Sequence, residues 1–296
     1  MDMVFSANSE VDYQNLTVAV DTESCLPYGV SRFTYRDDYS VLLFPNTVRQ
    51  IVSPRHEING LLQIGLDVGY EAPEGLRPSH TIGLGGGGDR QRYPSLMSQL
   101  ELVLGPSSFA LYLNKPVCDH IDGELIIGGG DSNLYTPPLT FVPLSLQDVP
   151  VVPVAHLKIG NSFERPIDGF AIIDTGAQDM LVPEPHRDVL RERILTEIAI
   201  RSGTEAGSNY IPTLDLTIFD CFFMRFLPPI EIGLGKLGEA PTTLTNYARK
   251  VDGTCFLAIK GAADNRWTLP AFIIPGNYFE FQPSEGRLGV AKLRDW

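Results

Sequence analysis

The sequence has 296 residues, and its 36 acidic residues against 23 basic ones give a formal net charge of −13. So large an acidic excess argues against nucleic acid or an anionic membrane as a partner. With 43% apolar and 20% charged residues the chain is not disordered, and no apolar run reaches the ~18 residues of a membrane span. The length suits two ordinary lobes or one large all-β domain.

The N-terminal segment, MDMVFSANSEVDYQ, has no basic region and no apolar signal core. It indicates a cytoplasmic protein, or the mature form of a secreted protein whose leader has been removed. The five histidines are scattered and the four cysteines lack metal-ligand spacing, so the sequence predicts no metal site and no cofactor.

Short apolar runs rich in β-branched residues recur along the chain and predict strands, from LTVAV (16–20) to AFIIPG (271–276). Helical periodicity is confined to residues 94–104 and 184–200, and the second segment has Pro185 near its start. The pattern predicts an all-β protein with two or three helices.

Two segments repeat one pattern, an apolar strand followed by Asp-Thr and a turn. Asp21 lies in LTVAVDTES (16–24), and Asp174 lies in FAIIDTGAQ (170–178). Each segment is followed later by an apolar-apolar-Gly element, which we place at 81–83 and at 273–276. A two-lobed protein with one Asp-Thr loop in each lobe would bring the two carboxylates together across an approximate two-fold axis.

In their order, these segments resemble the pepsin-like aspartic proteases from about residue 16 to the C-terminus. DGELIIGGGDSNLYTPPLTFVPL (122–144) is similar to the inter-lobe segment of the family, and FEFQPSEGRLGVAKL (279–293) to its closing strands. The resemblance implies a bilobal all-β fold of two β-barrel lobes related by a pseudo-two-fold axis. The expected lobes are residues 1–147 and 148–296. It also implies a Cys221–Cys255 disulfide, while pairing of Cys25 with Cys118 stays open.

The resemblance further implies that Asp21 and Asp174 form a catalytic dyad. Two carboxylates a hydrogen bond apart share one proton, because ionising both is unfavourable, and so they supply one acid and one base. Aspartic proteases are the standard example of such a pair. Residues 32–45 resemble the flap over the cleft and place Tyr35 and Arg36 near the substrate. The residues expected to support the catalytic loops are Thr22, Glu23, Ser24, Thr175, Gly176 and Ala177.

Three departures from the family pattern bear on function. Glu23 stands where the family has glycine, and adds a third carboxyl beside the predicted dyad. Ala177 replaces a hydroxyl residue and so removes a hydrogen-bond donor from Asp174, whereas Ser24 keeps the corresponding donor for Asp21. The stretch between the first Asp and the flap is far shorter than in the family, which predicts a truncated N-terminal lobe.

Three functions remain open at this point. The first is acid/base chemistry by the dyad on a small molecule, such as dehydration, isomerisation, cyclisation or hydrolysis in a biosynthetic pathway. A truncated lobe favours it, because extended peptides bind by main-chain pairing along strand edges. The second is an active aspartic endopeptidase, and the third a non-catalytic pepsin-fold binding protein. The small-molecule or peptide substrate is expected in the inter-lobe cleft, and uncovered apolar edges would be compatible with an oligomer.

Overall fold

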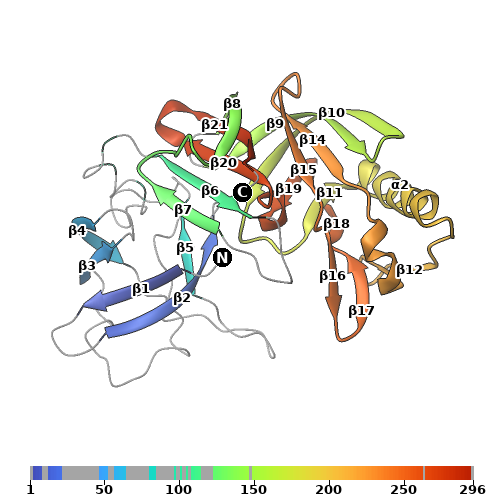
Figure 1. Ribbon diagram of the computed structural model, residues 1–296, viewed down its shortest axis with the longest axis horizontal. Coiled ribbons are helices and arrows are strands. Elements are labelled where there is room, and N and C mark those ends of the chain that lie inside the picture. Colours follow the sequence, from blue (N-terminus) through green and yellow to red (C-terminus); the bar gives the residue numbers. More distant parts are fainter. Residues whose placement is uncertain are drawn as a thin grey trace. The chain divides into compact units, whose positions relative to one another are not determined.

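The computed structural model divides the chain into two compact units, whose elements are labelled in Figure 1. The first unit comprises residues 1–107 and 147–149, and the second comprises residues 108–146 and 150–296. The structure describes residues 3–8, 13–21, 47–52, 57–64, 80–84, 97, 101, 105, 108–114, 123–146, 149–262 and 264–294.

The described strands of the first unit form two small sheets. β1 (Met3–Asn8) and β2 (Tyr13–Asp21) pair antiparallel, and β5 (His80–Gly83) joins β2 in parallel. A separate antiparallel pair consists of β3 (Thr47–Val52) and β4 (Glu57–Ile64). The first Asp-Thr motif therefore begins at the end of β2, as the sequence predicts.

The largest sheet of the second unit has seven strands in the order β15-β14-β9-β10-β19-β11-β18 (Figure 1). Its edge strand β15 alternates buried and exposed residues, the period expected when one face of a sheet covers a core. The strands are β9 (Val151–Ile159), β10 (Phe163–Asp174), β11 (Met180–Pro183), β14 (Ile230–Leu234), β15 (Ala240–Leu244), β18 (Ile259–Ala262) and β19 (Arg266–Pro270).

A second sheet of this unit joins the expected inter-lobe segment to the closing strands, in the order β7-β6-β20-β21-β8. Phe109 stacks on Phe281 across it, with ring centroids 4.5 Å apart. The strands are β6 (Phe109–Leu113), β7 (Gly123–Ile127), β8 (Tyr135–Pro143), β20 (Asn277–Gln282) and β21 (Arg287–Leu293). The predicted strands at 279–293 are confirmed.

The third sheet of this unit is smaller and has the order β12-β13-β17-β16. The predicted Cys221–Cys255 disulfide is present and joins β17 to the 3₁₀ helix η3 (Cys221–Phe226). The strands are β12 (Ser208–Ile211), β13 (Leu216–Phe219), β16 (Ala248–Val251) and β17 (Thr254–Leu257).

Helix α2 (Glu184–Ser202) confirms the helix predicted at 184–200. Proline in its first turn suits the start of a helix, because a first-turn N–H has no intrahelical partner. The helix ends at Gly203, whose left-handed φ of 70° lets its N–H bond to the carbonyl of Ala199. In the segment 94–104, the two described residues Met97 and Glu101 are helical.

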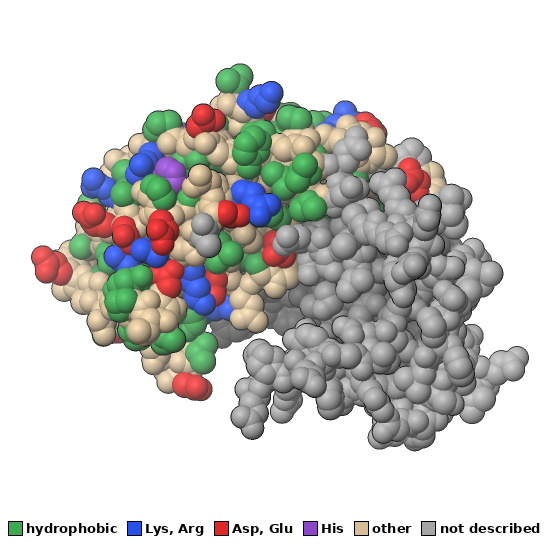
Figure 2. Space-filling model, turned by 180° about the vertical axis from the view of Figure 1, so that it is seen from behind, with side chains coloured by type: hydrophobic (Ala, Val, Ile, Leu, Met, Phe, Trp, Pro, Cys, Tyr) green, Lys and Arg blue, Asp and Glu red, His purple; other side chains and the backbone are tan. Residues whose placement is uncertain are grey.

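Acidic and basic side chains are interspersed over the face of the described residues that Figure 2 shows. This mixing gives that face no continuous positive field of the kind that binds nucleic acid. None of the described helices is both long and apolar enough to cross a membrane.

Candidate active site

Asp174 is the last residue of β10, directly after three buried apolar residues, Ala171, Ile172 and Ile173. The strand lies inside the seven-stranded sheet, between β9 and β19. This position explains why an apolar run precedes the acid, since a strand covered on both sides is apolar throughout. Asp174 itself is half-buried at the strand end, where its carboxylate can meet a ligand.

The partner of β10 at this point is β19, which runs parallel to it and places Pro270 opposite Asp174. The apolar-apolar-Gly element at 273–276 is therefore not the segment that pairs with Asp174. Those residues follow β19, within and after the 3₁₀ helix η4 (Ala271–Ile273), and Pro275 forms an isolated bridge with Leu113. The sequence pattern contains a glycine, whereas β19 has Pro270 at that position.

The first unit contains the same arrangement. β2 and β5 are parallel, and their register places Asp21 opposite Gly83, so the apolar-apolar-Gly element at 81–83 is the segment that pairs with Asp21. Each Asp thus ends a strand whose parallel neighbour presents a turn-forming residue at the same level. The two pairs differ in that residue, which is glycine in the first unit and proline in the second.

The turn after Asp174 passes over the end of β19. β11 runs antiparallel to β19, with Leu181 opposite Thr268, whereas β10 runs parallel to it. Because β19 lies between β10 and β11 in the sheet, residues 175–179 must cross above Pro270 to connect them. The short connection leaves this turn little freedom to change its shape.

Backbone groups of the turn bind the carboxylate of Asp174. Oδ1 of Asp174 accepts a hydrogen bond from the Gly176 N–H at 2.8 Å and another from the Ala177 N–H at 3.0 Å. The sequence indicates only the hydroxyl donor that Ala177 lacks. The two N–H groups had no signal of their own, since every residue except proline carries one.

The far end of the turn is attached to neighbouring strands. The Asp179 carboxylate pairs with Lys260 Nζ of β18 at 2.7 Å, and Arg249 of β16 donates a hydrogen bond to the carbonyl of Gln178. The Met180 N–H bonds to the carbonyl of Ala258 at 2.9 Å. Sequence reasoning missed Lys260 and Arg249, because contacts between distant segments leave no local pattern.

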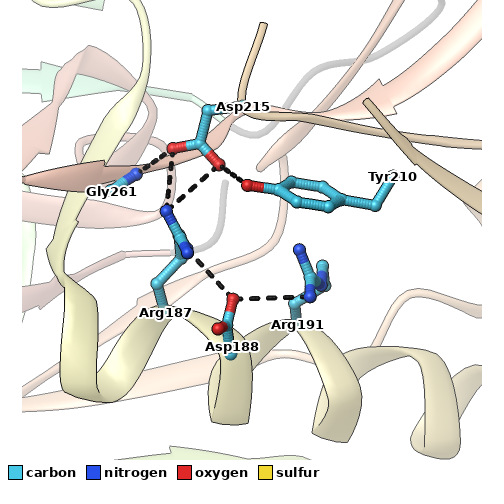
Figure 3. Close-up of polar contacts among 6 residues, drawn as sticks. All are labelled: Arg187, Asp188, Arg191, Tyr210, Asp215 and Gly261. Carbon is cyan, nitrogen blue, oxygen red and sulfur yellow. Dashed lines mark hydrogen bonds and ion pairs between the residues drawn. The ribbon is translucent and has the colours of Figure 1, made fainter. Parts of the chain in front are cut away.

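β18 is attached in turn to a polar cluster beside α2 (Figure 3). Asp215, in the turn between β12 and β13, accepts hydrogen bonds from the Gly261 N–H and, at 2.7 Å, from the Tyr210 hydroxyl. Arg187 Nη1 lies 3.4 Å from Asp215 Oδ1. A Cβ at Gly261 would lie 2.7 Å from Arg187 Nη1, so glycine lets the strand approach this closely.

The charges of this cluster are mutually compensated. Arg187 also donates to Asp188 at 3.0 Å, and Arg191 lies 3.4 Å from Asp188 while covering the Tyr210 ring at 4.0 Å. Burial, the largest single influence, opposes ionisation of Asp215. The hydrogen bonds from Gly261 and Tyr210 and the charge of Arg187 together outweigh it and lower the pKa of Asp215.

His186 of α2 packs on Trp267 of β19, with ring centroids 5.6 Å apart. Burial, followed by the nearby positive charge of Arg165, lowers the pKa of His186. The neutral form of His186 is therefore the form that suits this packing.

Several predicted site residues lie outside the described part of the chain: Thr22, Glu23, Ser24, Tyr35, Arg36, Cys25 and Cys118. Asp21 is described as the end of β2, and Thr175, Gly176 and Ala177 lie directly after β10. Asp21 and Asp174 belong to different units, so their pairing stays a prediction, as do the predicted lobes. Within the described residues, no group of three or more His, Cys, Asp or Glu side chains could hold a metal ion.

An all-β chain in which two Asp-Thr motifs each follow a strand with a parallel partner defines a pepsin-like protein of the aspartic protease class. The family model for the eukaryotic aspartyl protease matches residues 84–293, more than two thirds of the sequence, and the chain belongs to this family. Asp174 lies within the matched residues, and Asp21 precedes them.

Curated relatives are similar over most of the chain. Renin of Echis ocellatus is 28% identical over 206 residues, 67% of this chain and 48% of the renin. Gastricsin of Mus musculus is 24% identical over 277 residues, 90% of this chain and 65% of the gastricsin. Cathepsin D of Clupea harengus is 26% identical over 201 residues, 68% of this chain and 49% of the cathepsin. The chain spans about half the length of the renin and of the cathepsin D.

Proposed function

We propose that the protein is an enzyme in which Asp21 and Asp174 act as a carboxylate pair in acid/base chemistry on a small molecule. One observation carries the proposal. Each acid ends a strand with a parallel partner, and each faces a turn-forming residue at the same register, Gly83 or Pro270. Such an equivalence is expected if the two acids serve one site.

The chemistry follows from the shared proton. The ionised carboxylate takes a proton from water or from the substrate, while the protonated carboxylate gives its proton to a carbonyl or leaving oxygen. The two acids exchange roles and the pair keeps its total charge. The N–H groups of Gly176 and Ala177 would hold Asp174 in position throughout, since they bind its Oδ1.

The departures from the family support a compact substrate rather than an extended one. Glu23 adds a side chain where the family has none, and the segment between Asp21 and Tyr35 is short. Pro270 lacks the N–H that a glycine would offer beside Asp174. Each change removes room or main-chain donors from a site that would otherwise pair with an extended peptide.

Peptide hydrolysis is the second candidate, favoured by the match to the eukaryotic aspartyl protease family. Two assays distinguish the candidates, and each compares the wild type with Asp21→Asn and Asp174→Asn. The control variant is Asp264→Asn, which changes an exposed acid just before β19. The first assay follows cleavage of a denatured protein between pH 3 and 7. The second follows a panel of small esters, acetals and β-hydroxy carbonyl compounds.

We expect turnover in the small-molecule panel that falls by about 10²–10⁴-fold in both dyad variants, the usual contribution of acid/base catalysis. Protein cleavage that is lost in both variants would instead show a peptidase. Activity that survives either substitution would exclude the dyad. Binding of panel compounds without turnover, unchanged in both variants, would show a binding protein.

A further inference from the structure

We propose that Lys260 is a positioning residue, which fixes Asp174 by holding the far end of the turn that binds it. The inference rests on the proposed function, in which Asp174 is a reacting group. Lys260 touches Asp179 and acts only through the turn formed by residues 175–179. The role is thus separate from that of the dyad.

The turn is short enough that the position of its far end should affect the hydrogen bonds at its near end. Its near end begins at Asp174 and its far end enters β11 at Met180, and both strands flank β19. The N–H groups of Gly176 and Ala177, which bind Asp174 Oδ1, belong to the same short turn as Asp179 and precede it closely in the chain. A shift at Asp179 would therefore lengthen both hydrogen bonds.

The ion pair at the far end is short and partly shielded from water. Lys260 Nζ lies 2.7 Å from Asp179 Oδ2, and the Asp179 side chain is only 18% exposed. Without the lysine, this carboxylate would lose its cation in a site that water reaches poorly, which favours movement of the turn outward. Arg249 holds the adjacent carbonyl of Gln178 and so acts in the same direction.

The strand that carries Lys260 is itself held firmly. The next residue, Gly261, donates its N–H to Asp215, which Arg187 of α2 and Tyr210 of β12 also bind (Figure 3). On the other side, β18 pairs in parallel with β11, which places Leu181 opposite Lys260. Lys260 therefore connects the turn to a fixed part of the unit.

The test compares Lys260→Met with Lys158→Met as a matched control. Lys158 is 38% exposed against 37% for Lys260, and it pairs with Glu231 at 3.2 Å in the same sheet. It lies opposite Glu164, near the start of β10 and so at the other end of that strand from Asp174. Amide hydrogen exchange of Gly176 and Ala177, measured by NMR, reports the two hydrogen bonds. Gly176 is the more specific probe, because the Ala177 N–H also bonds to the Asp174 carbonyl at 3.2 Å. Lys260→Arg keeps the charge and serves as the rescue variant.

We expect Lys260→Met to speed exchange at Gly176 and Ala177 by up to about fivefold, the upper end of the range given by the loss of a partly exposed ion pair. Lys158→Met should leave both rates unchanged, and Lys260→Arg should restore them. Unchanged exchange in Lys260→Met would overturn the inference. If that variant fails to fold, Asp179→Asn removes the same ion pair at nearly constant shape and should give the same acceleration.

Where a substrate is turned over, Lys260→Met should lower kcat and leave KM unchanged, since it displaces the reacting carboxylate and not a binding group. An equal loss of kcat in Lys158→Met would contradict the role. If Asp21→Asn and Asp174→Asn leave activity intact, the proposed function fails, and the exchange rates still decide whether Lys260 holds the turn.

Discussion

Asp174 and Pro270 lie opposite each other in the parallel strands β10 and β19. Asp21 and Gly83 have the equivalent register in the parallel strands β2 and β5. Proline fixes φ near −65° and has no N–H, whereas glycine is the least restricted residue. Pro270 has a φ of −79° and is buried beneath the turn. The second Asp therefore sits above a stiffer support than the first.

Replacing Pro270 by glycine should destabilise the protein by at least about 1–2 kcal/mol, because the unfolded chain gains freedom at a residue that proline had restricted. Loss of the buried ring should add to this cost. Urea unfolding measures the effect, with Pro283→Gly in the half-exposed 3₁₀ helix η5 (Pro283–Glu285) as the control for entropy alone. A Pro270→Gly protein as stable as the wild type would show that the proline does not support the turn.

Asp215 should make the protein acid-sensitive. Its pKa is lowered in the fold, so its stabilising effect is complete above the unfolded pKa of about 4 and is lost as the pH falls through the folded value. Asp215→Asn should reduce stability at neutral pH and remove this part of the acid dependence. The control is Asp252→Asn, since Asp252 is exposed and has a φ of 48°, close to the 47° of Asp215. Parallel stability–pH curves for the wild type and Asp215→Asn would contradict the prediction.

His186 should add a second pH dependence in a higher range. Its pKa is lowered by burial and by Arg165, so the neutral form is stabilised above the unfolded pKa of about 6.5. That stability is lost as the pH falls through the lower folded value. His186→Phe keeps an aromatic ring against Trp267 and should flatten the curve below pH 6.5. Thermal unfolding followed by tryptophan fluorescence tests this, and an unaltered slope would count against it.

The Cys221–Cys255 disulfide should stabilise the second unit by about 2–4 kcal/mol, since it closes a loop across a sequence separation of 34. It also fixes β17, which pairs with the strand that carries Arg249. The double variant with serine at both positions should therefore unfold at lower urea, with Gly176 and Ala177 exchanging faster. Loss of stability without faster exchange would show that the disulfide stabilises the unit but does not affect the turn after Asp174.

The sequence predicted the features that repeat locally. The apolar run before Asp174 identified the end of β10, and periodicity located α2 to within two residues at its C-terminal end. A resemblance in segment order identified the family and the disulfide, although no single motif was specific. These features are coded by neighbouring residues, which is why pattern alone could find them.

The remainder depends on contacts between distant segments. Pro270 was missed as the partner of Asp174 because proline replaces the glycine that the pattern requires. Lys260 lies in β18 and Asp179 in the turn before β11, and nothing in their local sequences indicates an ion pair. Backbone donors to Asp174 were invisible for a further reason, since the conformation of the turn creates them and residue identity does not.

β18 is the last strand of its sheet, and its outer N–H groups would normally be open to pairing with another chain. One of these groups, the Gly261 N–H, donates instead to the side-chain carboxylate of Asp215. A carboxylate at this point blocks the addition of a foreign strand, because an incoming carbonyl would have to displace a negative charge held by Arg187. Removing the turn between β12 and β13 should therefore leave the Gly261 N–H open to an incoming strand.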